Sequence, residues 1–318
     1  MVHSLVYISG MRIPPPAQRE APARRGFAMA LMIASSVIIS FGGLISRSME
    51  DADPTQINFY RSLALCLTFG LVFAFNHKGN SVRDFRKVGW SGVLASLCLT
   101  VAGIAFMQAL ANTTVANTMF TLASIPFITA GLAWVFLREN LSRLTIVTMV
   151  AAAIGVSLMV VDGMGLGSIY GNLMALITAL GFSGFAVIVR RNRHIDMLPA
   201  LIVSAVFIVL ISLALRYDDL AISWWDIALC VIWGSALSGI GNYLFIIASR
   251  HLVAGELTLF MLLEFAISPV WVWIVVRETP TQWALAGGIL VILSVATRAL
   301  LEMNGKTSLL KRGRPSPI

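Results

Sequence analysis

The sequence predicts an all-α integral membrane protein with ten transmembrane helices in a 5+5 inverted repeat. Three observations predict this fold: an apolar composition, long stretches without charged residues, and a side-chain pattern that recurs in both halves. Of the 318 residues, 58% are hydrophobic and 12% are charged, about half the ~25% charge of a soluble domain. A soluble chain of this size cannot bury so much apolar surface. This excludes a cytosolic enzyme or a nucleic-acid-binding domain as the main body, although the net charge is +8.

The long apolar stretches give the number of helices, because a spanning helix needs roughly 20 mainly apolar residues. Residues 88–137 contain no charged residue and are long enough for two spans, with a polar turn at 112–114. Two other stretches each contain one charge, Arg61 or Glu264. The ten spans are expected in residues 26–46, 56–76, 88–137 (two spans), 144–161, 163–189, 197–215, 227–249, 257–276 and 279–297.

The distribution of Lys and Arg predicts the orientation, because cytoplasmic loops carry an excess of these residues. With the N-terminus inside, 18 of the 23 Lys and Arg residues lie in inner segments and three lie at outer ends. The outer loops instead hold acidic residues such as Asp51 and Asp218. We therefore expect a multi-pass protein of a bacterial inner membrane, with both termini in the cytoplasm.

The connections between the expected spans are short, which predicts one bundle rather than separate domains. Residues 1–25 contain Pro14, Pro15 and Pro16 together with basic residues, and they are typical of a disordered cytoplasmic tail. We divide the remainder into a first five-helix repeat at 26–162, a second five-helix repeat at 163–302, and a basic cytoplasmic tail at 303–318.

The two halves match at an offset of 139 residues. Three pairs in equivalent spans share this offset: Trp134 and Trp273, Arg138 and Arg277, and Glu139 and Glu278. A repeat with an odd number of spans inserts upside down relative to its partner. Inverted repeats are characteristic of secondary transporters, whose substrate site lies near the midplane at the repeat interface. The alternative is a duplicated bundle that serves only as a scaffold.

A stripe of mostly small and polar residues in the third span also recurs in the eighth span. Its spacing of 4, 3 and 4 residues keeps one helical face, and polar groups are poorly placed against lipid. We therefore expect both stripes to face the interior of the bundle. They comprise Ser96, Thr100, Gly103 and Met107 in the first half, and Ser235, Gly239, Asn242 and Ile246 in the second.

Several short motifs resemble the EamA-type family of the drug/metabolite transporter superfamily over about residues 26–303. They are Phe59-Tyr60-Arg61 with Ala64, Ser124-Ile125-Pro126 leading to Arg138-Glu139, Gly171 with Ala175, Leu263-Glu264 with Pro269, and Glu278-Thr279-Pro280. The resemblance implies a 5+5 inverted repeat around a central cavity that moves small metabolites, often outward. The sequence departs from the family in span one, where the frequent Trp-Gly is Phe41-Gly42.

Two charged residues are the main candidates for a substrate or proton site. Glu264 lies near the middle of its span, where a charge costs ~2.5–3.5 kcal/mol on insertion scales. It could exchange a proton or attract a cation; alternatively it fixes helix packing through hydrogen bonds. Arg61 lies close to the outer end of span two, where it could line a cavity or extend its charge to the membrane surface. The two side chains could neutralise each other or hold a substrate between them.

Other candidates are polar or aromatic residues of the spans. Ser268 and Trp271 share the helical face of Glu264, Thr121 and Ser124 belong to a polar stripe of span four with Asn117, and Asn242 belongs to the stripe of span eight. Hydroxyl and amide groups in spans more often bond to their own or a neighbouring helix, which is the alternative for each of them. Pro126 and Pro269 are candidate hinges, because proline frees a backbone carbonyl and permits a kink; the alternative is a static kink.

The sequence favours a secondary transporter that exports small amphipathic metabolites, such as amino acids, by alternating access. The alternatives are uptake of a vitamin or nucleoside-like metabolite, and a lipid scramblase or non-transporting membrane scaffold. We expect no enzymatic activity, no metal, no cofactor and no nucleic-acid partner. The expected partners are a small-molecule substrate, membrane lipids and, for the Glu264 site, a proton.

Overall fold

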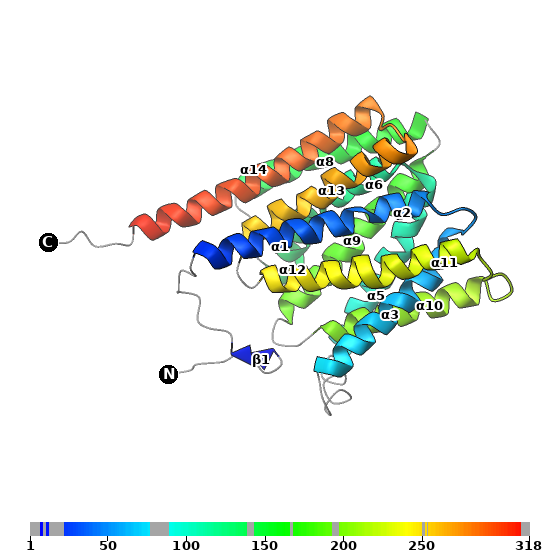
Figure 1. Ribbon diagram of the computed structural model, residues 1–318. Helices are drawn as coiled ribbons and strands as arrows, with labels where there is room; N and C mark the ends of the chain where they lie inside the picture. The colour runs from blue at the N-terminus through cyan, green and yellow to red at the C-terminus, as the bar shows by residue number, and fades with distance from the viewer. Residues whose placement is uncertain are drawn as a thin grey trace.

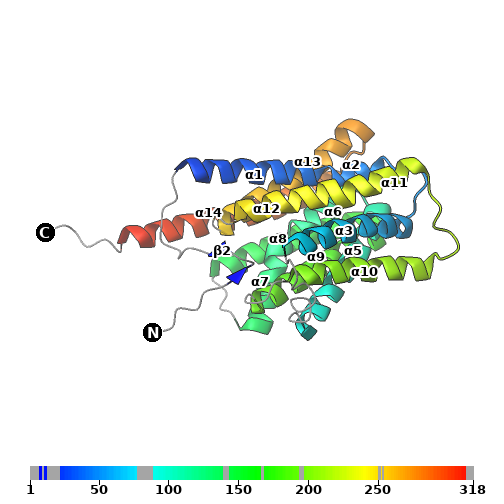
Figure 2. The ribbon, with the colours of Figure 1, turned by 60° about the horizontal axis from the view of Figure 1, so that its bottom comes forward.

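The computed structural model shows an elongated bundle whose helices run along one common direction (Figure 1). It describes residues 7–8, 11–12, 22–76, 89–138, 143–165, 168–192, 197–249, 252 and 254–312. The beginning of the first helix and the end of the last lie at the same end of the bundle (Figure 2). This arrangement agrees with an even number of membrane crossings.

The described chain is almost entirely helical. Two strands of two residues, β1 (Tyr7–Ile8) and β2 (Met11–Arg12), pair antiparallel, within the segment expected to be a disordered tail. The helices are α1 (Pro22–Ser40), α2 (Gly42–Arg47), α3 (Pro54–Asn76), α5 (Gly89–Asn112), α6 (Val115–Leu122), α7 (Ile125–Leu137), α8 (Arg143–Gly165), α9 (Ile169–Arg191), α10 (Leu198–Leu215), α11 (Trp224–Val231), the π-helix η1 (Ile232–Ile240), α12 (Gly241–Ser249), α13 (Ala254–Val276) and α14 (Gln282–Arg312).

The lengths of these helices match a membrane protein that crosses the bilayer several times. In the described part, five helices are long and apolar enough to span: Gly26–Arg47, Gly89–Asn112, Val115–Leu137, Ile169–Arg191 and Gln282–Leu301. Four shorter apolar helices accompany them: Arg143–Met159, Pro199–Leu215, Trp224–Ile240 and Phe260–Val276. The polar turn expected at 112–114 separates α5 from α6, so this prediction is confirmed.

Three of the expected spans depart from a continuous α-helix. The first is interrupted at Phe41 and the fourth at residues 123–124, while the eighth contains η1. In the fourth span Pro126 occupies the first turn of α7, a position where its missing N–H costs nothing. Pro269, in contrast, lies inside the continuous helix α13. The two hinge candidates therefore occupy different backbone environments.

Hydroxyl groups from neighbouring helices bond to the backbone at two of these irregular places. Ser183 on α9 donates to the carbonyl of Ile125 at 3.2 Å, directly after the break in the fourth span. Ser35 on α1 donates to the carbonyl of Gly241 at 2.8 Å, directly after η1. Ile125 begins α7 and Gly241 begins α12, so these hydroxyl groups join neighbouring helices at the irregular places while their own polar groups are satisfied inside the bundle.

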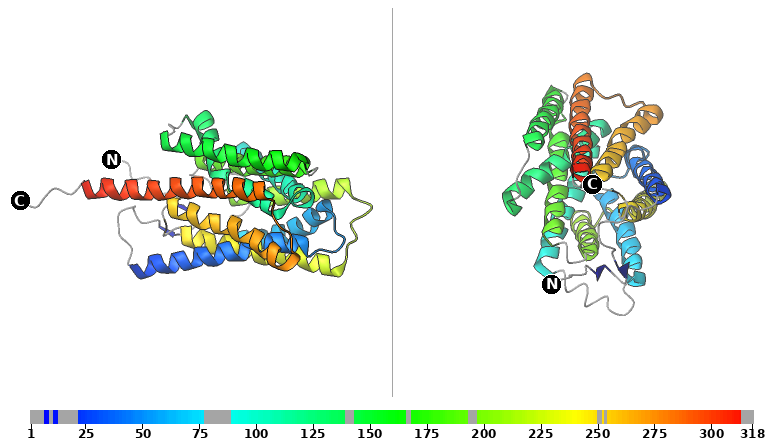
Figure 3. Two further views of the ribbon diagram at one scale, coloured as in Figure 1. Left: turned by 90° about the horizontal axis from the view of Figure 1, so that it is seen from above. Right: turned by 90° about the vertical axis from the view of Figure 1, so that its left-hand side faces the viewer.

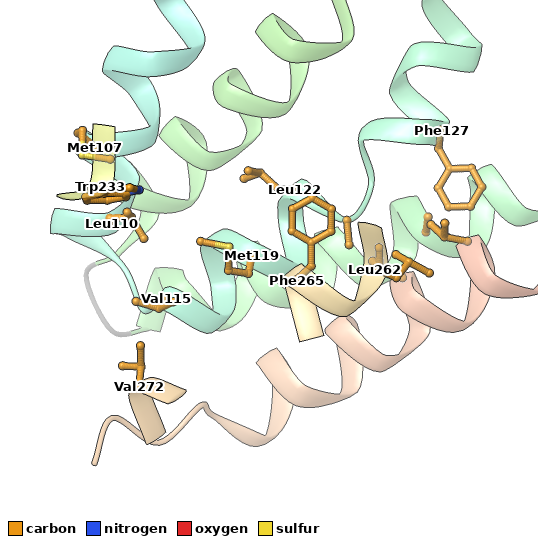
Figure 4. Packing of buried hydrophobic residues seen from close by; sticks show 14 of the residues in the cluster. Met107, Leu110, Val115, Met119, Leu122, Phe127, Trp233, Leu262, Phe265 and Val272 are labelled. Atoms are coloured by element: carbon orange, nitrogen blue, oxygen red, sulfur yellow. The ribbon is translucent and has the colours of Figure 1, made fainter. Parts of the chain in front are cut away.

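A cluster of buried apolar side chains fills the space between α5, α6, α13 and α14. Figure 4 shows Trp233 beside Met107 and Leu110 at one end of this cluster and Phe127 at the other. Many large apolar side chains elsewhere point outward, including Leu67, Phe136 and Leu293. Outward apolar residues are expected where the surrounding solvent is lipid.

Helices from the two halves pack directly against each other. Viewed along the bundle, α14 lies beside α8 and α10 lies beside α3 (Figure 3). The α8–α14 contact depends on two facing glycines: a Cβ added to Gly155 would lie 2.6 Å from the carbonyl oxygen of Gly287. Small residues at such places let helix backbones approach closely in membranes.

We predict that Gly155→Ala destabilises the protein, because the added methyl group meets backbone atoms that cannot rotate away. Overpacking of this kind costs about 1–3 kcal/mol. The matched control is Gly70→Ala on α3, where an added Cβ meets nothing within 4 Å and helix propensity favours alanine. The measurement is thermal unfolding of both variants in detergent. Equal melting temperatures would show that the α8–α14 contact is loosely packed.

Candidate functional site

The break in the first span brings three distant parts of the chain together. A Cβ on Gly42 would lie 2.9 Å from Nε1 of Trp233, on η1. A Cβ on Gly43 would lie 2.6 Å from Val115 and 2.7 Å from the hydroxyl of Ser268 on α13. Only glycine leaves room for these close approaches. The interruption therefore lies against both α13 and η1.

Aromatic stacking fixes the other side of the same break. The ring of Phe41 stacks on Trp271 with centroids 4.9 Å apart and an interplanar angle of 11°. The indole N–H of Trp271 donates to the hydroxyl oxygen of Ser40 at 3.0 Å. The predicted candidates Trp271 and Ser268 thus lie together at the break. Phe41, which stands where the family often has Trp, therefore still places an aromatic ring at the break, and this ring packs on Trp271.

Trp233 is a central residue that the sequence analysis did not identify. It is 4% exposed, and its ring lies 6.4 Å from that of Phe106 in an edge-on arrangement. The guanidinium of Arg61 lies over the same ring, 5.2 Å from its centroid. One signal in the sequence could have identified it. Trp is enriched at membrane interfaces, so a Trp nine residues inside its span, such as Trp233, is unusual and indicates a specific contact.

Arg61 lies inside the bundle, on α3, between η1 and α5. Its nearest terminal nitrogen would be 4.0 Å from a Cβ added to Gly103. Its Nε is buried and has no hydrogen-bond partner among the described residues. The same holds for the side-chain oxygen of Asn58, one turn earlier on α3. No ion pair of Arg61 is found among the described residues, so it is not neutralised by Glu264 there.

Glu264 lies half-buried on α13, on the side of this helix that follows the first span. One turn before it, the hydroxyl of Ser36 donates to the carbonyl of Phe260 at 2.8 Å. One turn after it, Ser268 approaches Gly43. Within the described part of the chain, no hydrogen bond or ion pair holds the Glu264 carboxyl group. No packing hydrogen bond among the described residues therefore accounts for its position.

The polar residues of the fourth span make mainly structural contacts. Asn117 donates to the hydroxyl of Thr113 at 3.2 Å and to the side-chain oxygen of Asn172 at 3.4 Å. Ser124 donates to the carbonyl of Thr121 at 2.6 Å. Thr121 and Ser124 are both buried. These contacts support the packing alternative for Ser124 more than a substrate contact.

The repeated stripe is buried in the first half, and its described residues in the second half, Ser235 and Gly239, are half-buried. Ser96 and Thr100 are buried and donate to carbonyls of their own helix, those of Gly92 and Ser96. Ser235 is half-buried and donates to Val231 within its own span. The remaining candidate, Asn242, is the second residue of α12, and its side chain lies outside the described residues.

An ion pair between Arg47 and Glu278 joins helices at one end of the bundle, and both side chains also form hydrogen bonds with backbone groups. Arg47 at the end of α2 donates from Nε to Glu278 at 2.6 Å. Its two terminal nitrogens donate to the carbonyls of Leu110 at 2.7 Å and Thr113 at 2.8 Å. The second oxygen of Glu278 accepts from the N–H of Val115, at the start of α6, at 2.7 Å. This network joins the ends of four helices.

A buried carboxylate ties the adjoining loop to the eighth span at the same end. Asp226 on α11 is fully buried. It accepts hydrogen bonds from the backbone N–H groups of Glu50 at 3.0 Å, Asp51 at 3.3 Å and Ala52 at 3.2 Å. The sequence analysis did not identify this residue, because a single Asp at the start of a span reads as an ordinary helix-initiating residue.

We predict that Glu278→Gln lowers the melting temperature, because Arg47 loses its counter-charge. Charge-assisted hydrogen bonds of this kind contribute about 1.5–3 kcal/mol. The matched control is Asp219→Asn, which removes an exposed pair with Arg216, three residues earlier, and exposed pairs contribute about 0–1 kcal/mol. Thermal unfolding in detergent measures both. Equal losses for the two variants would contradict the structural role of the Glu278 network.

Comparison with known proteins supports the fold and finds a family match in the first half of the chain. The EamA-like transporter family matches residues 26–161, which confirms the predicted resemblance over that part. One solved crystal structure of another protein has 16% sequence identity and a TM-score of 0.60, covering 87% of this chain and 98% of its own. At that identity the likeness shows the fold alone. No curated protein matches this sequence.

Proposed function

We propose that this EamA-like membrane protein is a secondary transporter that exports small amphipathic metabolites, such as amino acids, by alternating access. The observation that carries the proposal is the interrupted first span, whose residues Phe41–Gly43 meet Trp233, Ser268 and Trp271 inside the bundle. In secondary transporters the substrate site is formed by discontinuous helices where two repeats meet. Trp233 and Ser268 both belong to the proposed second repeat.

An inverted repeat of 26–162 and 163–302 is supported by how the helices pair. In the proposed repeat α1 corresponds to α9, α5 to α12, and α7 to α13. The α1–α12 contact of one half then corresponds to α9–α5, and the α1–α13 contact to α9–α7. All four contacts occur. Helix α3 corresponds to α10, and α8 corresponds to α14. The repeat therefore predicts that each of these pairs packs together, and both contacts occur. Random packing would not produce such matched pairs.

Backbone geometry adds independent support for the repeat. Among the described non-glycine residues, positive φ angles occur at Arg138, with 54°, and at Arg277, with 63°. These residues directly follow α7 and α13 and are one of the pairs separated by 139 positions. A left-handed residue is a common way to end a helix. Both repeats thus end their fourth span in the same manner.

The proposed orientation places the start of α1 and the end of α14 in the cytoplasm of a bacterium, below its inner membrane. These two helix ends lie at one end of the bundle (Figure 2), which agrees with the concentration of Lys and Arg in the segments assigned to that side. The network of Arg47, Glu278 and Asp226 then lies at the outer end.

Within this transporter we assign Glu264 the role of proton or cation site. An intramembrane carboxylate without a partner is a functional residue by default. The neighbouring side chains Ser268 and Trp271 offer a hydroxyl and an aromatic face to the same region. The break before Pro126 and the proline inside α13, Pro269, are the proposed hinges for alternating access.

We predict that Glu264→Gln is expressed normally but has lost transport or shows transport independent of pH. The amide keeps the shape of the carboxyl group but cannot exchange a proton. Glu264→Leu should also lose transport without unfolding, because it removes a charge whose insertion costs ~3 kcal/mol. The measurement is uptake of a panel of labelled metabolites into inside-out vesicles, with and without a pH gradient.

The matched control is Glu50→Gln, which changes an exposed carboxylate in the loop after α2 and should transport like the wild type. If Glu264→Gln transports like the wild type from pH 6 to 8, Glu264 is a packing residue and the proton role is refuted. If wild-type vesicles accumulate nothing above empty vesicles, the transporter proposal itself is refuted, leaving a scramblase or scaffold.

A further inference from the structure

Arg61 carries a positive charge that the described part of the chain does not neutralise. Its Nε is buried without an acceptor, and the salt bridges of the described residues involve Arg47 and Arg216 instead. The other arginine within the spans, Arg298, lies 5.9 Å from the ring centroid of Phe127 and donates to the carbonyl of Pro126 at 3.5 Å. Arg61 thus differs from Arg47, Arg216 and Arg298 in having no acceptor among the described residues.

The position of Arg61 argues against a side chain that extends to the membrane surface. It is the eighth residue of α3, so its Cα lies about 10 Å beyond the helix start at 1.5 Å per residue. The guanidinium lies over Trp233, which is itself buried. The start of α3 is contacted by the loop between α10 and α11, because Tyr60 donates to the carbonyl of Leu220 at 3.0 Å.

A buried arginine without a counter-ion is unfavourable, and arginine binds carboxylates with a matching planar fork. Stacking over Trp233 holds the guanidinium in one place while leaving its N–H groups, which lie in its plane, free to donate. The described part of the chain therefore offers this side chain no anionic partner, and an anion that arrives from outside the chain would supply one.

Asn58 supplies a second unsatisfied group one turn away on the same helical face. It is 2% exposed, and its side-chain oxygen has no donor. Residues three apart on a helix are separated by about 4.5 Å along its axis. An acceptor and a cation at this spacing match a ligand that carries a carboxylate and, next to it, an ammonium or another N–H donor.

We infer that Arg61, Asn58 and Trp233 form the subsite for the head group of an α-amino carboxylate substrate. Arg61 binds the carboxylate, Trp233 orients Arg61, and Asn58 accepts a hydrogen bond from the ammonium. This rests on the proposed transport function and names its substrate class. Glu264, on α13, remains a separate group that serves proton coupling.

The test is binding of matched small molecules to the full-length protein in nanodiscs of phosphatidylcholine, followed by thermal stability. The probes are L-leucine, L-phenylalanine and L-methionine, the amide of each, and the matching acid that lacks the amino group. We expect at least one amino acid to raise the melting temperature of the wild type, and its amide to do so with about tenfold or weaker apparent affinity.

Two variants, Arg61→Gln and Asn58→Leu, test which residues the stabilisation by the amino acid depends on, and Arg298→Gln is the control. Arg61→Gln should abolish the stabilisation by the amino acid, whereas Arg298→Gln, which removes the other arginine stacked on a ring, should retain it. Asn58→Leu, of similar size, should bind the amino acid and its deaminated acid equally, while the wild type prefers the amino acid. Arg61→Gln removes a buried charge and Asn58→Leu removes a buried amide whose oxygen has no donor, so these two variants should fold.

The inference is overturned if amino acid and amide stabilise the wild type equally, if no carboxylate stabilises it, or if Arg61→Gln keeps the response. It is also overturned if only phosphatidylglycerol in the nanodisc stabilises the wild type in an Arg61-dependent way, because the anion is then a lipid phosphate. Transport of amines or amides into vesicles would leave the transporter proposal intact while refuting this substrate class.

Discussion

The constraint on which the structure depends is that lipid supplies no hydrogen-bond partners to the backbone. Almost every described residue is therefore helical, and the irregular places within spans are contacted by neighbouring helices. Ser183 bonds to the carbonyl of Ile125 after one interruption, and Ser35 bonds to that of Gly241 after the π-helix. A membrane protein can keep irregular backbone only where neighbouring helices cover it, so the irregular segments identify the part of the bundle that is shielded from lipid.

Charged groups divide into two populations with different physical roles. At the end of the bundle, Arg47, Glu278 and Asp226 have their hydrogen bonds satisfied by each other or by backbone groups of neighbouring segments, so they join helices. Further inside, Arg61 and Glu264 have no such partners in the described chain. Their unmet interactions are what a transporter needs, because binding a ligand then replaces a missing contact instead of competing with an existing one.

The sequence predicted the helical character of the chain and the turn at 112–114. Hydropathy and charge spacing indicate apolar helices, because insertion into lipid is decided by stretches of about 20 residues. Glu264 and Arg61 became candidates because a charge stands out in an apolar run. The environment of Trp233 and Asn58 could not be predicted, because it depends on which helices meet. The break at Phe41 likewise lies against Trp271 and Trp233, and such tertiary packing is not encoded in a local pattern.

The most direct test of alternating access is a pair of distances measured by pulsed electron spin resonance on the same protein in nanodiscs. One spin-label pair, at positions 51 and 279, reports on the end that holds Arg47 and Glu278, and a second pair, at positions 26 and 191, reports on the opposite end. The account predicts two populations at each end, with the longer distance at one end accompanied by the shorter at the other. It further predicts that Glu278→Gln shifts the first pair toward the longer distance and the second toward the shorter. A single distance at both ends, unchanged by that substitution, would contradict it.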